Sequence, residues 1–176
     1  MKGVQRLTSR SYADPRGRFI VAWETALLAE LEGWSPFVQE SLSESHQNVL
    51  RGLHMQHPRQ QGKLIRVVSG AIFDVVVDLR PDSETFCQWR AHKLDAASAD
   101  ALWIPPGLAH GFLVLSAAAT VLYQVTAPWD PGGELVVCWS DPSLGIDWPQ
   151  DGPPTLSARD ASAPPLAQVL KQLPLH

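Results

Sequence analysis

The chain has little cysteine, no strongly basic stretch and no long apolar run. Two cysteines, Cys87 and Cys138, are too few for a disulfide framework, and we expect both to be buried free thiols. A net charge of −4 argues against a nucleic-acid surface. No run of roughly eighteen apolar residues occurs, and residues 1–16 lack the apolar core of a signal peptide. We therefore expect a cytoplasmic protein with no membrane partner.

The composition is that of an ordinary globular protein, with 45% apolar and 18% charged residues. A length of 176 residues suits one domain, and we expect a single domain over residues 1–176. Seven tryptophans and fifteen prolines favour strands and turns over a helical bundle.

Short apolar or alternating runs separated by turn residues recur along the chain. They predict strands at residues 19–23, 49–55, 63–68, 71–79, 86–94, 101–104, 111–115, 120–125 and 134–139. Helices are predicted only at 24–31 and 166–173. The clearest alternation, in residues 71–80, places Asp74 and Asp78 on one face and Phe73, Val75 and Val77 on the other. The pattern predicts an all-β fold, a cupin-type jelly-roll β-barrel with short flanking helices.

Such barrels usually bind a metal through three histidines and a glutamate. Here His110 fits the second half of that pattern, but Met55 follows His54 where a paired histidine is needed, and Lys63 stands where the glutamate would be. An ammonium group cannot ligate a divalent cation. We expect no metal and read His46, His57, His92 and His176 as surface residues.

Three groups suited to proton transfer fall on predicted strands: His54, Lys63 and Tyr123. Each alone is better explained structurally, as a core histidine, a strand-edge lysine and a packed tyrosine. Together they would supply a base, a cation and a phenolic acid, which proton abstraction next to a carbonyl requires. Arg51 has the planar fork that suits phosphate, although a solvent-facing role fits the sequence equally well.

Several blocks, in order and at the expected spacing, resemble the dTDP-4-dehydrorhamnose 3,5-epimerase family of metal-free cupin dimers. They are Asp14-x-Arg16-Gly17-x-Phe19, Phe37-Val38-Gln39, Arg51-Gly52-Leu53-His54, Gln61-Gly62-Lys63-Leu64, Phe73-Asp74-Val75, Ile104-Pro105-x-Gly107-x-Ala109-His110-Gly111-Phe112, Leu122-Tyr123, Trp139-x-Asp141-Pro142 and Leu156-Ser157-Ala158-Arg159-Asp160. The resemblance covers residues 14–160.

This resemblance implies a homodimeric isomerase of deoxysugar biosynthesis without a cofactor. His54 would be the general base with Asp160 as its carboxylate partner, Tyr123 the acid on the opposite face, and Lys63 the neighbour of the sugar C4 oxygen. The resemblance also implies substrate-binding residues: His110 beside the sugar, Arg51 and a partner-derived Arg16 at the pyrophosphate, and Phe19, Gln39 and Trp129 around the nucleotide base.

Several positions depart from the family pattern. Residues 39–43 read Gln-Glu-Ser-Leu-Ser where the family commonly has Gln-Asp-Asn-His-Ser, Trp129 replaces a frequent tyrosine, and Val21 replaces a common glutamate. These departures concern substrate recognition, so the sugar, the nucleotide and the number of inverted carbons stay open. The alternatives are a mono-epimerase on another 4-keto sugar, a non-catalytic nucleotide-sugar-binding module, a metal cupin and a 3,4-ketoisomerase.

Overall fold

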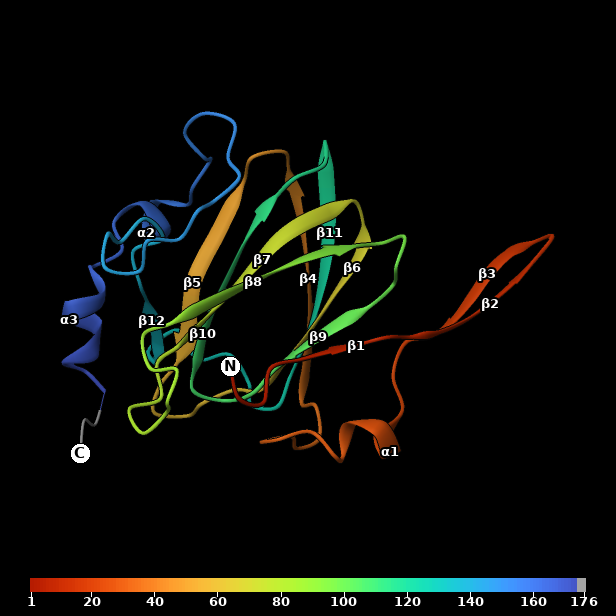
Figure 1. Ribbon diagram of the computed structural model, residues 1–176, viewed down its shortest axis with the longest axis horizontal. Coiled ribbons are helices and arrows are strands. Elements are labelled where there is room, and N and C mark those ends of the chain that lie inside the picture. Colours follow the sequence, from red (N-terminus) through yellow and green to blue (C-terminus); the bar gives the residue numbers. More distant parts are fainter. Residues whose placement is uncertain (174–176) are drawn as a thin grey trace.

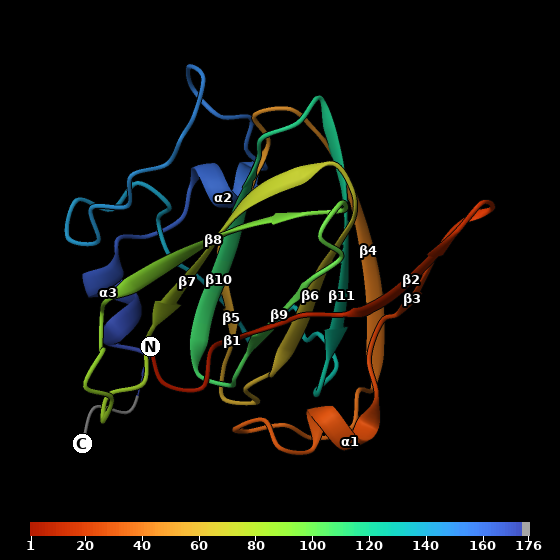
Figure 2. The same cartoon turned by 45° about the vertical axis from the view of Figure 1, so that its right-hand side comes forward.

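The computed structural model describes residues 1–173, so the prediction for His176 lies outside the described residues. Two five-stranded antiparallel sheets face each other (Figures 1 and 2). The first contains, in spatial order, β1 (Gln5–Leu7), β9 (Ala101–Ile104), β6 (Lys63–Ser69), β11 (Ala118–Val125) and β4 (Gln39–His46). The second contains β12 (Glu134–Val136), β5 (Leu50–Gln56), β10 (Leu108–Val114), β7 (Ala71–Asp78) and β8 (Trp89–Asp95).

The remaining elements lie outside the barrel. A separate hairpin of β2 (Arg10–Asp14) and β3 (Gly17–Val21) projects away from it (Figure 1). Three short helices flank the sheets: α1 (Thr25–Leu28), α2 (Ala158–Ala161) and α3 (Leu166–Leu170). No described helix is long and apolar enough to cross a membrane.

Apolar side chains form three clusters. The first fills the barrel between the sheets and includes Ile65, Val76, Leu102, Phe112 and Val121. The second lies on the outer face of the second sheet, where α3 and the chain around Trp148 cover it. The third joins Trp103 to Leu28 beside α1. The central strands β7 and β10 are therefore buried on both faces, which is why they are mostly apolar.

The expectation of an all-β jelly roll with short flanking helices is confirmed. The alternation predicted in residues 71–80 is present, because Val76 packs inside the barrel while Val75 and Val77 pack outside it. The helices are shorter than predicted. Strand β8 begins three residues later than predicted, because Cys87 adopts a left-handed backbone conformation with φ of 59° in the preceding turn.

Some expectations are wrong. Cys87 and Cys138 are free but half-buried, because Cys87 lies in the turn before β8 and Cys138 in the irregular segment after β12. His57 and His92 are half-buried instead of surface residues, whereas His46 is exposed. Strands β1, β2 and β4 were not predicted individually, because β2 is fully exposed and β4 carries mostly polar residues, so neither shows a clear apolar alternation.

A buried carboxylate stabilises the turn after β7. Asp78 is fully buried and accepts hydrogen bonds from Arg80 (Nε to Oδ1, 2.9 Å), Ser83 (2.6 Å) and Thr85 (2.6 Å). Burial opposes ionisation, but these hydrogen bonds outweigh it and lower the pKa of Asp78 to about 2.

We predict that Asp78→Asn lowers the free energy of unfolding by about 2 kcal/mol at pH 7. Because the folded-state pKa is depressed, this stabilisation is present above about pH 4 and is lost as the pH falls through about 2. Urea unfolding of both proteins at several pH values checks it. The matched control Asp82→Asn, at an exposed position of the same turn, should change stability by less than about 0.5 kcal/mol. If both substitutions lowered the free energy of unfolding equally, the stabilising role given to the Asp78 carboxylate would be wrong.

Candidate active site

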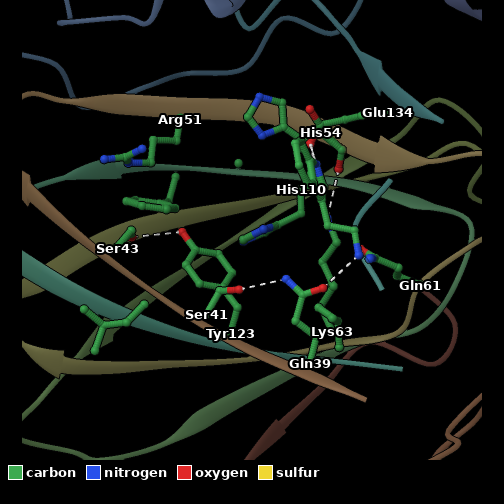
Figure 3. A pocket seen from close by; sticks show the side chains of 15 residues that line it. Gln39, Ser41, Ser43, Arg51, His54, Gln61, Lys63, His110, Tyr123 and Glu134 are labelled. Carbon is green, nitrogen blue, oxygen red and sulfur yellow. Dashed lines mark hydrogen bonds between the residues drawn. The ribbon is translucent and has the colours of Figure 1, made fainter. Parts of the chain in front are cut away.

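A cavity of about 420 Å³ opens between the two sheets (Figure 3). The first sheet contributes side chains from β4, β6 and β11, and the second from β5, β10 and β12. The lining residues are Gln39, Ser41, Leu42, Ser43, Arg51, His54, Gln61, Lys63, His110, Gly111, Phe112, Tyr123, Val125, Trp129 and Glu134. Polar and titratable groups thus converge from both walls on one space, as in a ligand-binding site.

Two glycines bring the histidine-bearing strands together. Gly52 has φ of 121°, and a Cβ on it would lie 2.5 Å from the Cα of Gly111. A Cβ on Gly111 would in turn lie 2.7 Å from the carbonyl oxygen of Arg51. Only glycine at both positions permits this approach of β5 and β10. The register shifts at the same place, and His54 comes to lie directly opposite His110.

His54 forms a dyad with a residue from the C-terminal part of the chain. Its Nε2 lies 2.6 Å from Oδ1 of Asp160, which leaves Nδ1 for the cavity. Ser157 caps α2 by accepting a hydrogen bond from the Asp160 backbone N–H and donates its hydroxyl to Oδ2 of Asp160 (2.9 Å). Burial opposes the ionisation of Asp160, but the hydrogen bonds from His54 and Ser157 keep its pKa below the usual value. The carboxylate is thus held ionised against the imidazole.

A second histidine is paired in the same way. His110 and Asp74 are both buried, and Nε2 of His110 lies 2.7 Å from Oδ2 of Asp74. Asp74 was not predicted as a site residue. The available signal was a carboxylate within the apolar run of β7, on the face that the alternation assigns to the barrel interior.

Lys63 is 9% exposed, and its Nζ donates to the backbone carbonyl of His54 at 3.1 Å. Burial lowers the pKa of Lys63 to about 8, although Glu134 and Asp74 favour the charged form. The cation is therefore poorly compensated, which suits a group that stabilises negative charge on a bound molecule.

Tyr123 comes from the wall opposite His54. It lies on β11 of the first sheet, whereas His54 lies on β5 of the second. Its hydroxyl is 3.2 Å from the Ser43 hydroxyl, and its ring packs near His110 with centroids 6.4 Å apart. Burial raises the pKa of Tyr123 far above its usual value, against the opposing effects of Ser43 and Arg51. Tyr123 is therefore a neutral hydroxyl facing the cavity (Figure 3).

The more exposed part of the cavity contains the residues expected to bind a nucleotide. Arg51 is exposed and is oriented by Ser45, which accepts from its Nε at 3.0 Å. Trp129 is 51% exposed, and its backbone N–H donates to Gln39 (2.9 Å) while its indole N–H donates to Glu134 (3.2 Å). Ser43, Gln61 and Glu134 are lining residues that the sequence did not single out.

Two expected binding residues are not at this cavity. Arg16 lies at the turn of the hairpin, where it pairs with Asp14 at 2.6 Å and its side chain is 90% exposed. Phe19 lies on β3 and is 69% exposed. Within one chain, the structure therefore does not bring Arg16 and Phe19 to His54.

Within residues 1–173, no group of three or more histidine, cysteine, aspartate or glutamate side chains has the arrangement of a metal site. The two cavity histidines are each engaged by a carboxylate, and Lys63 lines the same space.

The family model described as dTDP-4-dehydrorhamnose 3,5-epimerase matches residues 1–168. The chain is 45% identical over 166 residues to the dTDP-4-dehydrorhamnose 3,5-epimerase of Salmonella typhimurium, covering 93% of this chain and 91% of that protein.

Solved structures agree. The dTDP-6-deoxy-D-glucose-3,5-epimerase of Legionella pneumophila, in complex with dTDP-4-keto-L-rhamnose, superposes with a TM-score of 0.91 at 40% identity, covering 96% of this chain and 93% of that one. A 3'-monoepimerase from Streptomyces bikiniensis, in complex with dTDP-quinovose, gives 0.89 at 35% identity, covering 97% and 87%. With the fold, the cavity and the family model in agreement, the chain belongs to the dTDP-4-dehydrorhamnose 3,5-epimerase family of isomerases.

Proposed function

We propose that this protein inverts C3, C5 or both carbons of a dTDP-linked 4-keto-6-deoxyhexose by removing and returning a proton next to the C4 ketone. The observation that carries the proposal is the placement of the His54–Asp160 dyad and of Tyr123 on opposite walls of one cavity. Inversion needs a base on one face of the carbon and an acid on the other, and these walls supply them.

His54 takes the proton from the carbon, and the electron pair of the broken C–H bond moves into the enolate of the C4 ketone. Asp160 orients the imidazole and stabilises its protonated form. The buried Lys63 ammonium group stabilises the enolate oxygen, with His110 beside it. The carbon then takes the hydroxyl proton of Tyr123 from the opposite face. Exchange with solvent returns a proton to the phenolate and removes one from His54, so no external cofactor is consumed.

We assign the nucleotide end of the substrate to the exposed part of the cavity. The Arg51 guanidinium is suited to the pyrophosphate, because its fork matches phosphate oxygens. The indole of Trp129 offers a face for stacking the base, and its two N–H contacts to Gln39 and Glu134 fix that face.

We also propose a homodimer in which the β2–β3 hairpin packs against a second copy. A two-stranded hairpin is marginally stable alone. Here all of β2 is exposed, and two aromatic residues have large exposed fractions, 58% for Tyr12 on β2 and 69% for Phe19 on β3. Docking on the partner would cover these rings and could bring Arg16 and Phe19 to the partner's cavity. A cytoplasmic location and independence from a cofactor stay predictions.

The number of inverted carbons is the open part of the proposal, since both 3,5-epimerases and a 3'-monoepimerase share this fold. Incubation with dTDP-4-keto-6-deoxyglucose in deuterated water, followed by NMR, counts the deuterons incorporated at C3 and C5. Label at both carbons supports the double inversion, and label at one carbon makes the protein a mono-epimerase. No label at either carbon would reject this substrate and favour the non-catalytic binding module.

We predict that the two faces separate in mutants. His54→Ala should lower deuterium incorporation by a factor on the order of 10²–10⁴, because the base is lost. Tyr123→Phe should lower net inversion by a similar factor while leaving more of the initial exchange. NMR exchange rates and product analysis on the same samples measure both. Nucleotide binding, measured by calorimetry with dTDP, should survive both substitutions. Full exchange in His54→Ala would show that another group is the base.

The Lys63 cation gives a pH prediction. Its pKa of about 8 means that the charged form is present below pH 8 and is lost above it. The value of kcat/KM for exchange should therefore fall about tenfold per pH unit above this pKa. In Lys63→Met, deuterium exchange should be slow at every pH, and its kcat/KM should not fall at alkaline pH. An unchanged alkaline profile in Lys63→Met would assign that fall to another group.

A further inference from the structure

His92 is a titratable residue that the proposed mechanism does not use. It lies on β8 and is half-buried, and its Nε2 is shielded from solvent without a hydrogen-bond partner among the described residues. Buried imidazole nitrogens normally have a partner, so an unpaired one requires an explanation.

The adjacent strand carries an atom of the opposite kind. Asp74 on β7 is fully buried and uses Oδ2 for His110, while its Oδ1 has no partner among residues 1–173. The register places Asp74 directly opposite His92 in the antiparallel pair β7–β8. Residues in this relation point to the same face, with Cβ atoms about 5 Å apart. An acceptor without a donor and a nitrogen without a partner therefore share one face of the sheet.

We propose that His92 is a positioning residue whose Nε2–H holds Oδ1 of Asp74, directly or through one buried water, and so completes a chain from His110 through Asp74 to His92. This chain crosses three neighbouring strands, β10, β7 and β8. His110 lines the cavity, whereas His92 is not among the lining residues. Its catalytic consequence rests on the proposed function, but the hydrogen bond itself does not.

The chemistry of the three groups fits such a chain. An ionised carboxylate only accepts hydrogen bonds, so a donor on each oxygen stabilises the anion. An anionic Asp74 keeps the Nε2 proton of His110 and directs its Nδ1 toward the substrate. It also stabilises a positive charge on His110 when that ring stabilises the enolate oxygen.

The charges around these three residues favour a neutral His92 that can donate one hydrogen bond. Burial lowers the pKa of His92, an effect to which Arg6 on β1, Arg90 on β8 and the N-terminal amine add and which Asp74 opposes. His92 is therefore a neutral ring with one N–H at neutral pH. The titratable groups that face Asp74 from other strands are His110, Lys63 and Tyr123. None of them is placed to bond to Oδ1.

Histidine NMR on the wild-type protein tests the hydrogen bond without any substitution. The ¹⁵N shifts of His92 at pH 7 should show the proton on Nε2, and this proton should have the downfield ¹H shift and slow solvent exchange of a buried hydrogen-bonded N–H. A proton on Nδ1, or an Nε2–H without these signs of a hydrogen bond, would overturn the proposal. This measurement needs no substrate, so it decides the inference even if the sugar tested is not turned over.

Substitution tests the effect on Asp74. In His92→Phe, which keeps a ring but no donor, the NMR resonance of the His110 Nε2–H should shift, because the carboxylate that accepts this proton has lost its second donor. Deuterium exchange at neutral pH should become about tenfold slower. His92→Gln restores a donor and should return both the resonance and the exchange rate toward wild type. The exposed control His46→Gln should change neither.

An unchanged His110 Nε2–H resonance in His92→Phe would overturn the proposal, and so would a His92→Gln variant that behaves like His92→Phe. A shifted resonance without any change in the exchange rate would refute only the link to catalysis. If His92→Phe fails to fold, the His92 Nε2–H resonance of the wild-type protein still decides the matter.

Discussion

The arrangement of the site depends on the close contact of β5 and β10 at Gly52 and Gly111. Without a side chain at either position, the two backbones approach more closely than any other residue pair would allow. The shift in register at this contact sets His54 opposite His110. Each histidine then meets a carboxylate from a different direction, Asp160 from outside the sheet and Asp74 from the neighbouring strand.

Burial in the barrel affects the pKa values of Lys63, Tyr123 and Asp160 in different ways. It lowers the pKa of Lys63 and raises that of Tyr123, because in both cases the neutral form is favoured where water is excluded. Asp160 stays ionised only because hydrogen bonds outweigh its burial. One environment thus provides an ionised carboxylate, a lysine close to its titration point and a protonated phenol. This combination is what a proton transfer between two faces of a carbon requires.

The sequence predicts much of the fold and of the site, but some strands and site residues are far easier to predict than others. The central strands β7 and β10 are apolar on both faces and are easy to recognise, whereas β2 and most of β4 are exposed and show no apolar periodicity. His54, Lys63 and Tyr123 can be selected from their residue types and strand positions. Asp160 cannot, since it lies 106 positions after His54 and no local pattern links the two residues. Its assignment depended on the resemblance to the family. The pairing of Asp74 with His110 depends on strand order, which alternation within one strand does not determine.

The dyad also links His54 to a segment that lies far along the chain. Asp160 lies near the C-terminus, and the segment that carries it attaches to the barrel through the bridge between Val49 and Thr155 and through the packing of α3 on the second sheet. During synthesis on the ribosome, the barrel strands emerge well before this segment. A nascent chain can therefore form most of the cavity while His54 still lacks its carboxylate partner. The proton transfer proposed for His54 thus depends on a segment that is made, and docks, after the barrel strands.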